Sequence, residues 1–169
     1  MLAFHQQMTL EGSTVSSAQS GLPVYRTTIR DEWIDYNGHL SEAYYVLIFG
    51  FTSDQLMVHL GMDAEYRQRT GCSLYTVEAH IRYLLEVQAE AEVEVVPQIV
   101  TAGDKKLHLA YEMYSAGDLV ATEEILALHV GGEPVASRLF PDDVRERIEQ
   151  ARAAHDASTI PSWIGRAIG

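Results

Sequence analysis

The sequence is short of cysteine, with Cys72 alone among its 169 residues. One thiol cannot form an internal disulfide, so we expect the protein to fold in a reducing compartment such as the cytoplasm. Basic residues are also scarce, because 12 Lys and Arg stand against 24 Asp and Glu and give a net charge of -12. This balance argues against a general nucleic-acid or membrane-surface binder, which needs attraction to phosphate or anionic lipid.

Long apolar runs and a leader segment are missing as well. The longest apolar run, around residues 43–51, is too short to cross a bilayer, and the chain does not begin with a charged and then apolar stretch. We therefore expect neither secretion nor membrane insertion. The hydrophobic share of 47% and the charged share of 21% are ordinary for one soluble domain.

The pattern along the chain predicts three parts. Residues 1–21 are rich in Ser, Gln, Gly and Thr without periodicity, which indicates a flexible N-terminal extension. Residues 22–157 carry the strand and helix patterns of one domain that ends in a helix opened by Pro141. Residues 158–169 are expected to form a tail.

A first strand over residues 22–30 is followed by a helix that Ser41 caps and that runs to about His59, where Gly61 ends it. The first half of this helix is apolar on nearly every side, which predicts a helix wrapped by other elements. A short helical turn is expected at residues 64–69.

The stretch "CSLYTVEAHIRYLLEV", residues 72–87, alternates with period two and predicts a long strand with one buried face. Three more strands are expected at about 91–101, 105–115 and 119–130, joined by Gly-containing hairpins into an antiparallel meander. The element order predicts an α+β domain in which an antiparallel sheet curls around one long helix, the hotdog fold. Its edge strands favour pairing with a second copy, as a homodimer or homotetramer.

Residues 33–45, "WIDYNGHLSEAYY", concentrate polar chemistry at the entrance of the helix. The pattern Asp35-x-Asn37-Gly38-His39-Leu40-x-x-Ala43-x-Tyr45 resembles the Asp-x-x-Gly-His-Val-Asn-Asn-Ala-x-Tyr motif of hotdog-fold acyl-CoA thioesterases, the 4-hydroxybenzoyl-CoA thioesterase-like group. Together with the alternating stretch, it is most similar to the thioesterases associated with L-carnitine dehydrogenase. That resemblance implies hydrolysis of a small acyl-CoA, betainyl-CoA, in carnitine breakdown, with the dehydrogenase expected on another polypeptide.

The residues themselves fit thioester chemistry. Backbone N–H groups at the start of a helix, here in the turn 37–40, can stabilise the negative charge that forms on an attacked carbonyl. Asp35 lies just upstream, where a carboxylate can activate water or attack the carbonyl itself, and the sequence leaves both roles open. Gly38 tolerates positive φ and close approach of a ligand. His39 either polarises the substrate or orients Asp35, or else it is a hydrogen-bonded structural residue.

The sequence departs from the commoner motif at Ser41 and Glu42, where the family has Asn-Asn. We hypothesise an acidic and aromatic site for a quaternary ammonium group, because cations are attracted to aromatic faces and to carboxylates. The candidates are Glu42 or Glu78 with Trp33, Tyr44, Tyr45 or Tyr75. The alternative is that the rings are core residues and that Glu42 only offsets the helix dipole.

Coenzyme A carries phosphates, and the nearest local positive cluster is Arg82, Lys105, Lys106 and His108. These side chains are predicted to bind the CoA moiety, or else to form a solvated strand face and an exposed hairpin. No metal-ligand spacing, Walker loop or dinucleotide fingerprint is present, so we expect no metal and no cofactor other than the CoA of the substrate.

Two other functions stay open at this point. A hydratase or dehydratase of the same fold needs a histidine and an acid at the acyl chain, and His39 with Asp35 is the nearby candidate pair. The second alternative function is a non-catalytic acyl-CoA sensor. It stays open because a fold alone does not establish catalysis.

Overall fold

The computed structural model describes residues 21–153 and 160–168. Nearly all of the predicted extension and the end of the predicted domain, residues 154–157, therefore lie outside the described part. The strands are β1 (Tyr25–Thr28), β2 (Cys72–Tyr83), β3 (Glu92–Ala102), β4 (Lys106–Ser115), β5 (Asp118–Gly131) and β6 (Ala136–Ser137). The helices are the short 3-10 helix η1 (Asp31–Trp33), α1 (Glu42–His59), α2 (Ala64–Thr70) and α3 (Asp142–Ala153).

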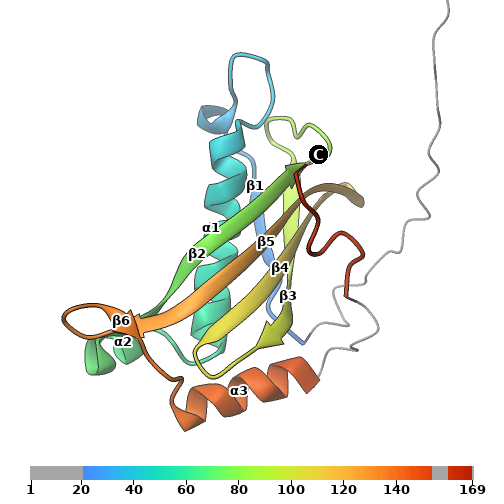
Figure 1. Ribbon diagram of the computed structural model, residues 1–169. Coiled ribbons are helices and arrows are strands. Elements are labelled where there is room, and N and C mark those ends of the chain that lie inside the picture. The colour runs from blue at the N-terminus through green and yellow to red at the C-terminus, as the bar shows by residue number, and fades with distance from the viewer. Residues whose placement is uncertain (1–20, 154–159, 169) are drawn as a thin grey trace, which may run out of the picture.

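The strands form one antiparallel sheet in the order β1-β3-β4-β5-β2, with the short β6 added to β5. The predicted meander is confirmed for β3, β4 and β5. Ala116 and Gly117 both have positive φ in the β4–β5 hairpin, which is the backbone of a tight two-residue turn. The strand β2 does not join the meander next to β3 but pairs with β5 at the opposite edge (Figure 1).

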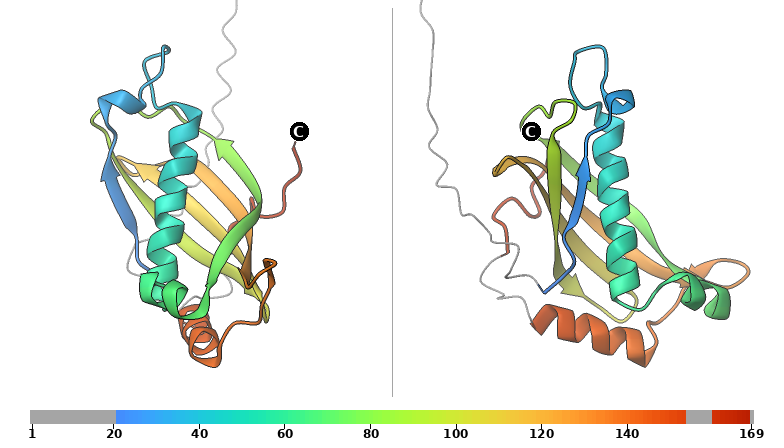
Figure 2. Two further views of the ribbon diagram at one scale, coloured as in Figure 1. Left: turned by 90° about the vertical axis from the view of Figure 1, so that its left-hand side faces the viewer. Right: turned by 180° about the vertical axis from the view of Figure 1, so that it is seen from behind.

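The long helix α1 lies across the concave face of the curled sheet, as Figure 2 shows in two views. Its start after Ser41 and its end just before Gly61, which has φ +84°, are as predicted. One side of α1 packs on the inner side chains of β4. The buried residues of these two surfaces are Tyr45, Ile48, Phe49, Thr52 and Leu56 from α1 and Leu107, Leu109, Tyr111 and Met113 from β4. The α+β hotdog fold is confirmed.

The prediction that one face of β2 is buried is wrong for the part of the chain that the structure describes. Tyr75 and Val77 are each 53% exposed, and the register of β2 on β5 shifts at Val77. The other side of α1 is open too, with Val46 and Leu47 exposed. The reason is geometric: β2 is an edge strand, and α1 packs toward β1 and β3, so that nothing in the described part of the chain covers Tyr75, Val77 or the outer side of the helix.

The helix α3 covers one end of the sheet and buries Val144, Ile148 and Ala151. The described part of the predicted tail, residues 160–168, lies against the outer face of the sheet, where Trp163 donates a hydrogen bond from Nε1 to Glu112 (2.9 Å). No helix in the described part of the chain is long and apolar enough to span a membrane.

Candidate active site

A closed turn precedes α1 and shapes the site. The backbone N–H of Asp35 donates to the carbonyl of His39 (3.0 Å), and the N–H of Gly38 donates back to the carbonyl of Asp35 (3.0 Å). Gly38 has φ +87°, and a Cβ there would meet no atom within 4 Å. The turn therefore requires glycine for its backbone conformation and not for lack of space.

This turn holds the Asp35 carboxylate. The backbone N–H of Asn37 donates to Oδ1 (2.7 Å), and the Asn37 side-chain amide donates to Oδ2 (3.3 Å). Such local bonds are typical of an Asx turn, and they fix the carboxylate while leaving further lone pairs on both oxygens. The Asp35 carboxylate is thus positioned by two hydrogen bonds from one residue, Asn37, which follows it in the same turn.

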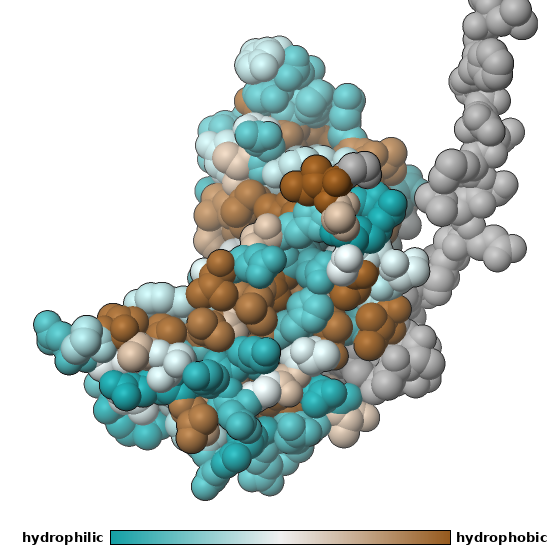
Figure 3. All heavy atoms as spheres, viewed as in Figure 1, coloured by the Kyte–Doolittle hydropathy of each residue, from teal (hydrophilic) through white to brown (hydrophobic). Residues whose placement is uncertain are grey.

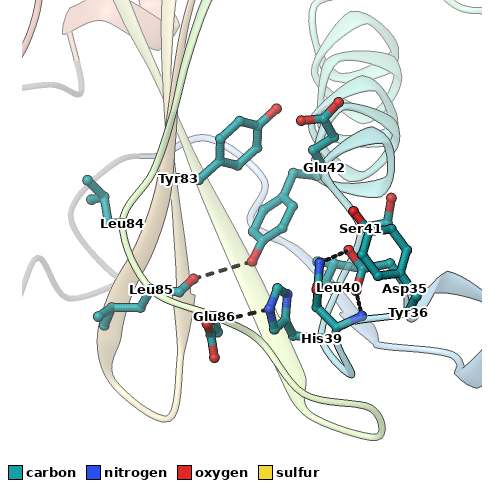
Figure 4. A pocket seen from close by; sticks show the side chains of 12 residues that line it. Asp35, Tyr36, His39, Leu40, Ser41, Glu42, Tyr83, Leu84, Leu85 and Glu86 are labelled. Atoms are coloured by element: carbon teal, nitrogen blue, oxygen red, sulfur yellow. Dashed lines mark hydrogen bonds and ion pairs between the residues drawn. The ribbon is translucent and has the colours of Figure 1, made fainter. Parts of the chain in front are cut away.

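The carboxylate faces a cavity of about 550 Å³ between the start of α1 and the segment that follows β2 (Figure 4). The turn and the first residues of α1 form one wall, and residues 83–86 form the other. Three carboxylates line this cavity, those of Asp35, Glu42 and Glu86, and no Lys or Arg is among the lining residues. The cavity is therefore acidic and favours a cation over an anion.

His39 points to Glu86 and not to Asp35. Its Nε2 lies 3.4 Å from Oε1 of Glu86, and the histidine side chain is 26% exposed. A hydratase reading rests on His39 paired with Asp35, and the geometry does not supply that pair. His39 contributes its carbonyl to the turn and its ring to the cavity wall.

Two tyrosines are among the residues that line the cavity. Tyr45 from α1 donates its hydroxyl to the carbonyl of Leu85 (3.3 Å), and its ring meets that of Tyr83 edge-on at 5.2 Å. Burial raises the pKa of Tyr45. Burial also raises the pKa of Tyr83, and the nearby carboxylates of Glu42 and Glu123 raise it further. The Tyr83 hydroxyl therefore lies within electrostatic reach of two acids.

Most of the backbone donors that the sequence indicated are already bonded. Three of the four backbone N–H groups of the turn 37–40 already donate a hydrogen bond. Those of Asn37 and Gly38 donate to Asp35, and that of Leu40 donates to the carbonyl of Val87 (2.7 Å). Within the described residues, no acceptor is present for the N–H groups of His39, Glu42 and Ala43. The first turn of α1 is exposed in this way because a helix leaves its first N–H groups without partners.

The predicted aromatic contacts divide into two groups. Tyr45 lines the cavity, but Trp33 is buried, stacks on Tyr44 at 5.5 Å and already carries the Arg30 guanidinium 5.0 Å from its ring centroid. The Trp33 ring thus makes its contacts within the chain and outside the cavity lining.

The remaining predicted binding residues lie away from the cavity. Tyr75, Glu78 and Arg82 are on β2 and are not among the lining residues. Lys105 and Lys106 are in the β3–β4 hairpin, and Lys105 donates to Ser137 (3.2 Å). Arg82 is opposite Thr122 and Lys106 is opposite Leu128, so along β5 they are about 20 Å apart at ~3.4 Å per residue. Within one chain they do not form a cluster.

His108 is a different case, because its ring is already engaged. Its Nε2 lies 2.7 Å from Oε1 of Glu124 on the outer face of the sheet. Among the described residues, no group of three or more His, Cys, Asp or Glu side chains is arranged to hold a metal ion.

Comparison with known proteins decides the family. The sequence matches the thioesterase-like superfamily over residues 29–148, which includes the turn, the cavity and the whole sheet except its first strand. The chain belongs to the thioesterase-like superfamily. The resemblance to acyl-CoA thioesterases is thereby confirmed, and with it the expectation of a thioester hydrolase.

Relatives within this superfamily are similar over most of the chain. A betainyl-CoA thioesterase of Pseudomonas aeruginosa is 39% identical over 150 residues, which cover 88% of this chain and 94% of that protein. An L-carnitine dehydrogenase/betainyl-CoA thioesterase of Rhizobium meliloti is 32% identical over 171 residues, covering 98% of this chain but 34% of that longer protein.

Two solved structures have the same fold. A putative thioesterase from Pseudomonas putida KT2440 superposes with a TM-score of 0.77 at 36% identity and covers 88% of this chain and 96% of its own. A hypothetical protein from Staphylococcus aureus, solved in complex with CoA, gives a TM-score of 0.82 at 25% identity, with coverage of 86% and 93%.

Proposed function

We propose that this member of the thioesterase-like superfamily hydrolyses betainyl-CoA to betaine and CoA. The observation that carries the proposal is the cavity beside Asp35, which is lined by three carboxylates and by no Lys or Arg. A neutral or anionic acyl group gains nothing from that lining, whereas a quaternary ammonium group is attracted to it. The 39% identity to a betainyl-CoA thioesterase supports the same substrate.

The reaction adds water across the thioester. Asp35 takes a proton from water that attacks the carbonyl carbon, or its carboxylate attacks first and water then opens the resulting anhydride. In both routes the carbon–sulfur bond breaks and the CoA thiolate leaves. The negative charge on the carbonyl oxygen is stabilised by the free N–H groups at the start of α1, those of Glu42 and Ala43.

The proposal extends to a homodimer formed through β2 and α1. An edge strand offers unpaired backbone groups to another strand, and apolar side chains lie beside it. Figure 3 shows apolar surface along the side of the molecule where β2 and α1 lie. Its exposed members include Val46, Leu47 and Phe51 of α1 and Tyr75 and Val77 of β2. A second copy would cover both at once, and each β2 would then have a strand on either side.

The test of the proposed reaction is thiol release from betainyl-CoA, acetyl-CoA, a medium-chain ester and an aromatic ester. Preferential release from betainyl-CoA that falls about 100-fold or more in Asp35→Asn is expected. Asp31→Asn, an exposed carboxylate in η1, is the matched control and should behave as wild type. Tight binding of these esters without release of thiol from any of them would favour a sensor and overturn the proposal.

A further inference from the structure

Glu123 is a buried acid at the centre of the sheet. Its side chain is on β5 and only 5% exposed. In the register of the sheet it is between Ile81 of β2 and Tyr111 of β4, on the inner face that α1 covers. Glu124, the next residue, points to the outer face and bonds to His108. The alternation of the strand thus puts one carboxylate outside and the other inside the fold.

The Glu123 carboxylate has no partner among the described residues. It forms no hydrogen bond or ion pair there, and the hydroxyl of the adjacent Tyr111 is already bonded to Ser53 (2.9 Å). Burial raises the pKa of Glu123 from 4.5 to about 7. A buried charge without a partner is costly, so this position is unfavourable unless something outside the chain's own side chains compensates it.

Tyr83 connects Glu123 to the acidic cavity. Tyr83 lines the cavity and is opposite Ala121, two residues before Glu123 on the same face of β5, or about 7 Å along the strand. Burial and the charges of Glu42 and Glu123 all raise the pKa of Tyr83, so both acids act on its hydroxyl. Glu123 is therefore on the same face of the sheet as Tyr83, next to a residue that lines the cavity.

We propose that Glu123 is the specificity-determining carboxylate that holds the quaternary ammonium group of the acyl chain, beyond Tyr45 and Tyr83 as seen from Asp35. The inference rests on the proposed function and names the residue that selects its substrate. Glu42 is the weaker candidate for that role because it is exposed. Attraction between charges is several times larger in a desolvated site than in water, so the buried acid discriminates more strongly between a cation and a neutral group.

The test compares two esters of the same shape. Betainyl-CoA carries a trimethylammonium group, and 3,3-dimethylbutyryl-CoA carries carbon in place of that nitrogen and no charge. In Glu123→Gln we expect kcat/KM for betainyl-CoA to fall about 10- to 100-fold, which is the effect of removing one partner of a buried charge pair. The value for the neutral ester should stay within about twofold, since it meets no charge. Glu124→Gln, on the outer face, should change neither.

The pH dependence of the wild-type protein provides a second measurement that needs no variant. The ratio of kcat/KM for the cationic ester to that for the neutral ester should rise several-fold between roughly pH 6 and pH 8, because Glu123 attracts the cation when it is ionised and not when it is protonated. The other titratable groups beside Glu123 are Tyr83 from β2 and Tyr111 from β4, and Glu42 from α1 acts on Tyr83. Burial raises the pKa of both tyrosines, so they stay neutral in this range. Groups that act on the thioester itself affect both esters and cancel in the ratio.

The outcomes separate the two proposals. A wild-type protein that releases thiol from both esters with a ratio unaffected by Glu123→Gln and by pH would overturn the role of Glu123 and leave the thioesterase in place. A wild-type protein that hydrolyses neither ester would overturn the proposed function and the inference with it. A selective loss for the cationic ester in Glu123→Gln, absent in Glu124→Gln, would establish Glu123 as the cation site.

Discussion

The hydroxyl of Tyr45 and the carbonyl of Leu85 join the two walls of the cavity with a hydrogen bond of 3.3 Å (Figure 4). Tyr45 is in the first turn of α1, and Leu85 follows β2, 40 residues later in the chain. This bond therefore fixes the width of the cavity between the helix that carries Glu42 and the segment that carries Glu86. Its loss should affect both the stability of the fold and the shape of the site.

Tyr45→Phe tests that bond. The ring stays buried while the hydroxyl is lost, so the free energy of unfolding should fall by about 1 kcal/mol, the usual contribution of one hydrogen bond. Urea denaturation followed by circular dichroism measures the change. Tyr36→Phe is the matched control, because Tyr36 is 96% exposed and its hydroxyl makes no hydrogen bond to another described residue. This variant should unfold as wild type does. Equal stability of both variants would show that the Tyr45 hydroxyl adds nothing.

The conformation of Gly38 gives a second prediction. Its φ of +87° is unfavourable for residues with a Cβ, so Gly38→Ala should cost about 1 to 2 kcal/mol although the added methyl meets open space. Gly38→Asn should cost less, because asparagine adopts positive φ more readily. Thermal unfolding of the three proteins gives the order. Thiol release should fall with it, since this turn holds the Asp35 carboxylate. Equal melting temperatures of Gly38→Ala and wild type would contradict the prediction.

The proposed dimer gives a third prediction. An acid placed in an apolar interface is desolvated without a partner, so Val77→Asp should convert a dimer of twice 18.8 kDa into a monomer. Val135→Asp is the control: Val135 is 61% exposed, against 53% for Val77, but is in the turn before β6 and away from both β2 and α1. Sedimentation velocity distinguishes the two masses. If the wild-type protein sediments as a monomer at every concentration, the proposal of a dimer is wrong.

Local signals explain what the sequence predicted well. Ser41 and Gly61 bracket α1, although the Ser41 side chain makes no capping hydrogen bond, because a left-handed glycine ends a helix by its own backbone conformation. Ala116 and Gly117 fix the β4–β5 hairpin in the same local way. The polar turn at Asp35 is predictable for the same reason, because the hydrogen bonds of Asp35 join residues at most four positions apart in the sequence. These features need no knowledge of the rest of the fold.

Features that depend on distant partners were not predicted. The alternation in β2 indicates an apolar face, but nothing in it tells whether this chain or a second one covers Val77. Glu86 became part of the cavity only because β2 ends beside the first turn of α1. Glu123 did have a signal: "ATEEILA", residues 121–127, alternates so that Glu123 shares a face with Ala121, Ile125 and Ala127, all three buried. An acid on an apolar strand face is the pattern that identifies such a residue.

The stability of Glu123→Gln gives a fourth prediction, independent of any substrate. The pKa of Glu123 is about 7 in the folded protein and near 4.5 when unfolded, so between these values the folded state binds more protons than the unfolded state. The free energy of unfolding of wild type must therefore fall as pH rises through this window, by about 1 to 3 kcal/mol in total. Glutamine does not titrate, so the free energy of unfolding of the variant should exceed that of wild type at pH 8. At pH 5 it should be equal to or below that of wild type.

Urea denaturation at both pH values checks this difference, and Glu124→Gln should show no such gain, because Glu124 is hydrogen-bonded to His108 and to the backbone of Gly165. A difference between Glu123→Gln and wild type that is the same at pH 5 and pH 8 would mean that Glu123 is not a desolvated carboxylate. A gain in stability joined to a loss of activity on the cationic ester has a direct interpretation. Residues that bind a charged ligand are held in positions that are unfavourable while the site is empty, and removing that charge relieves the fold at the expense of function.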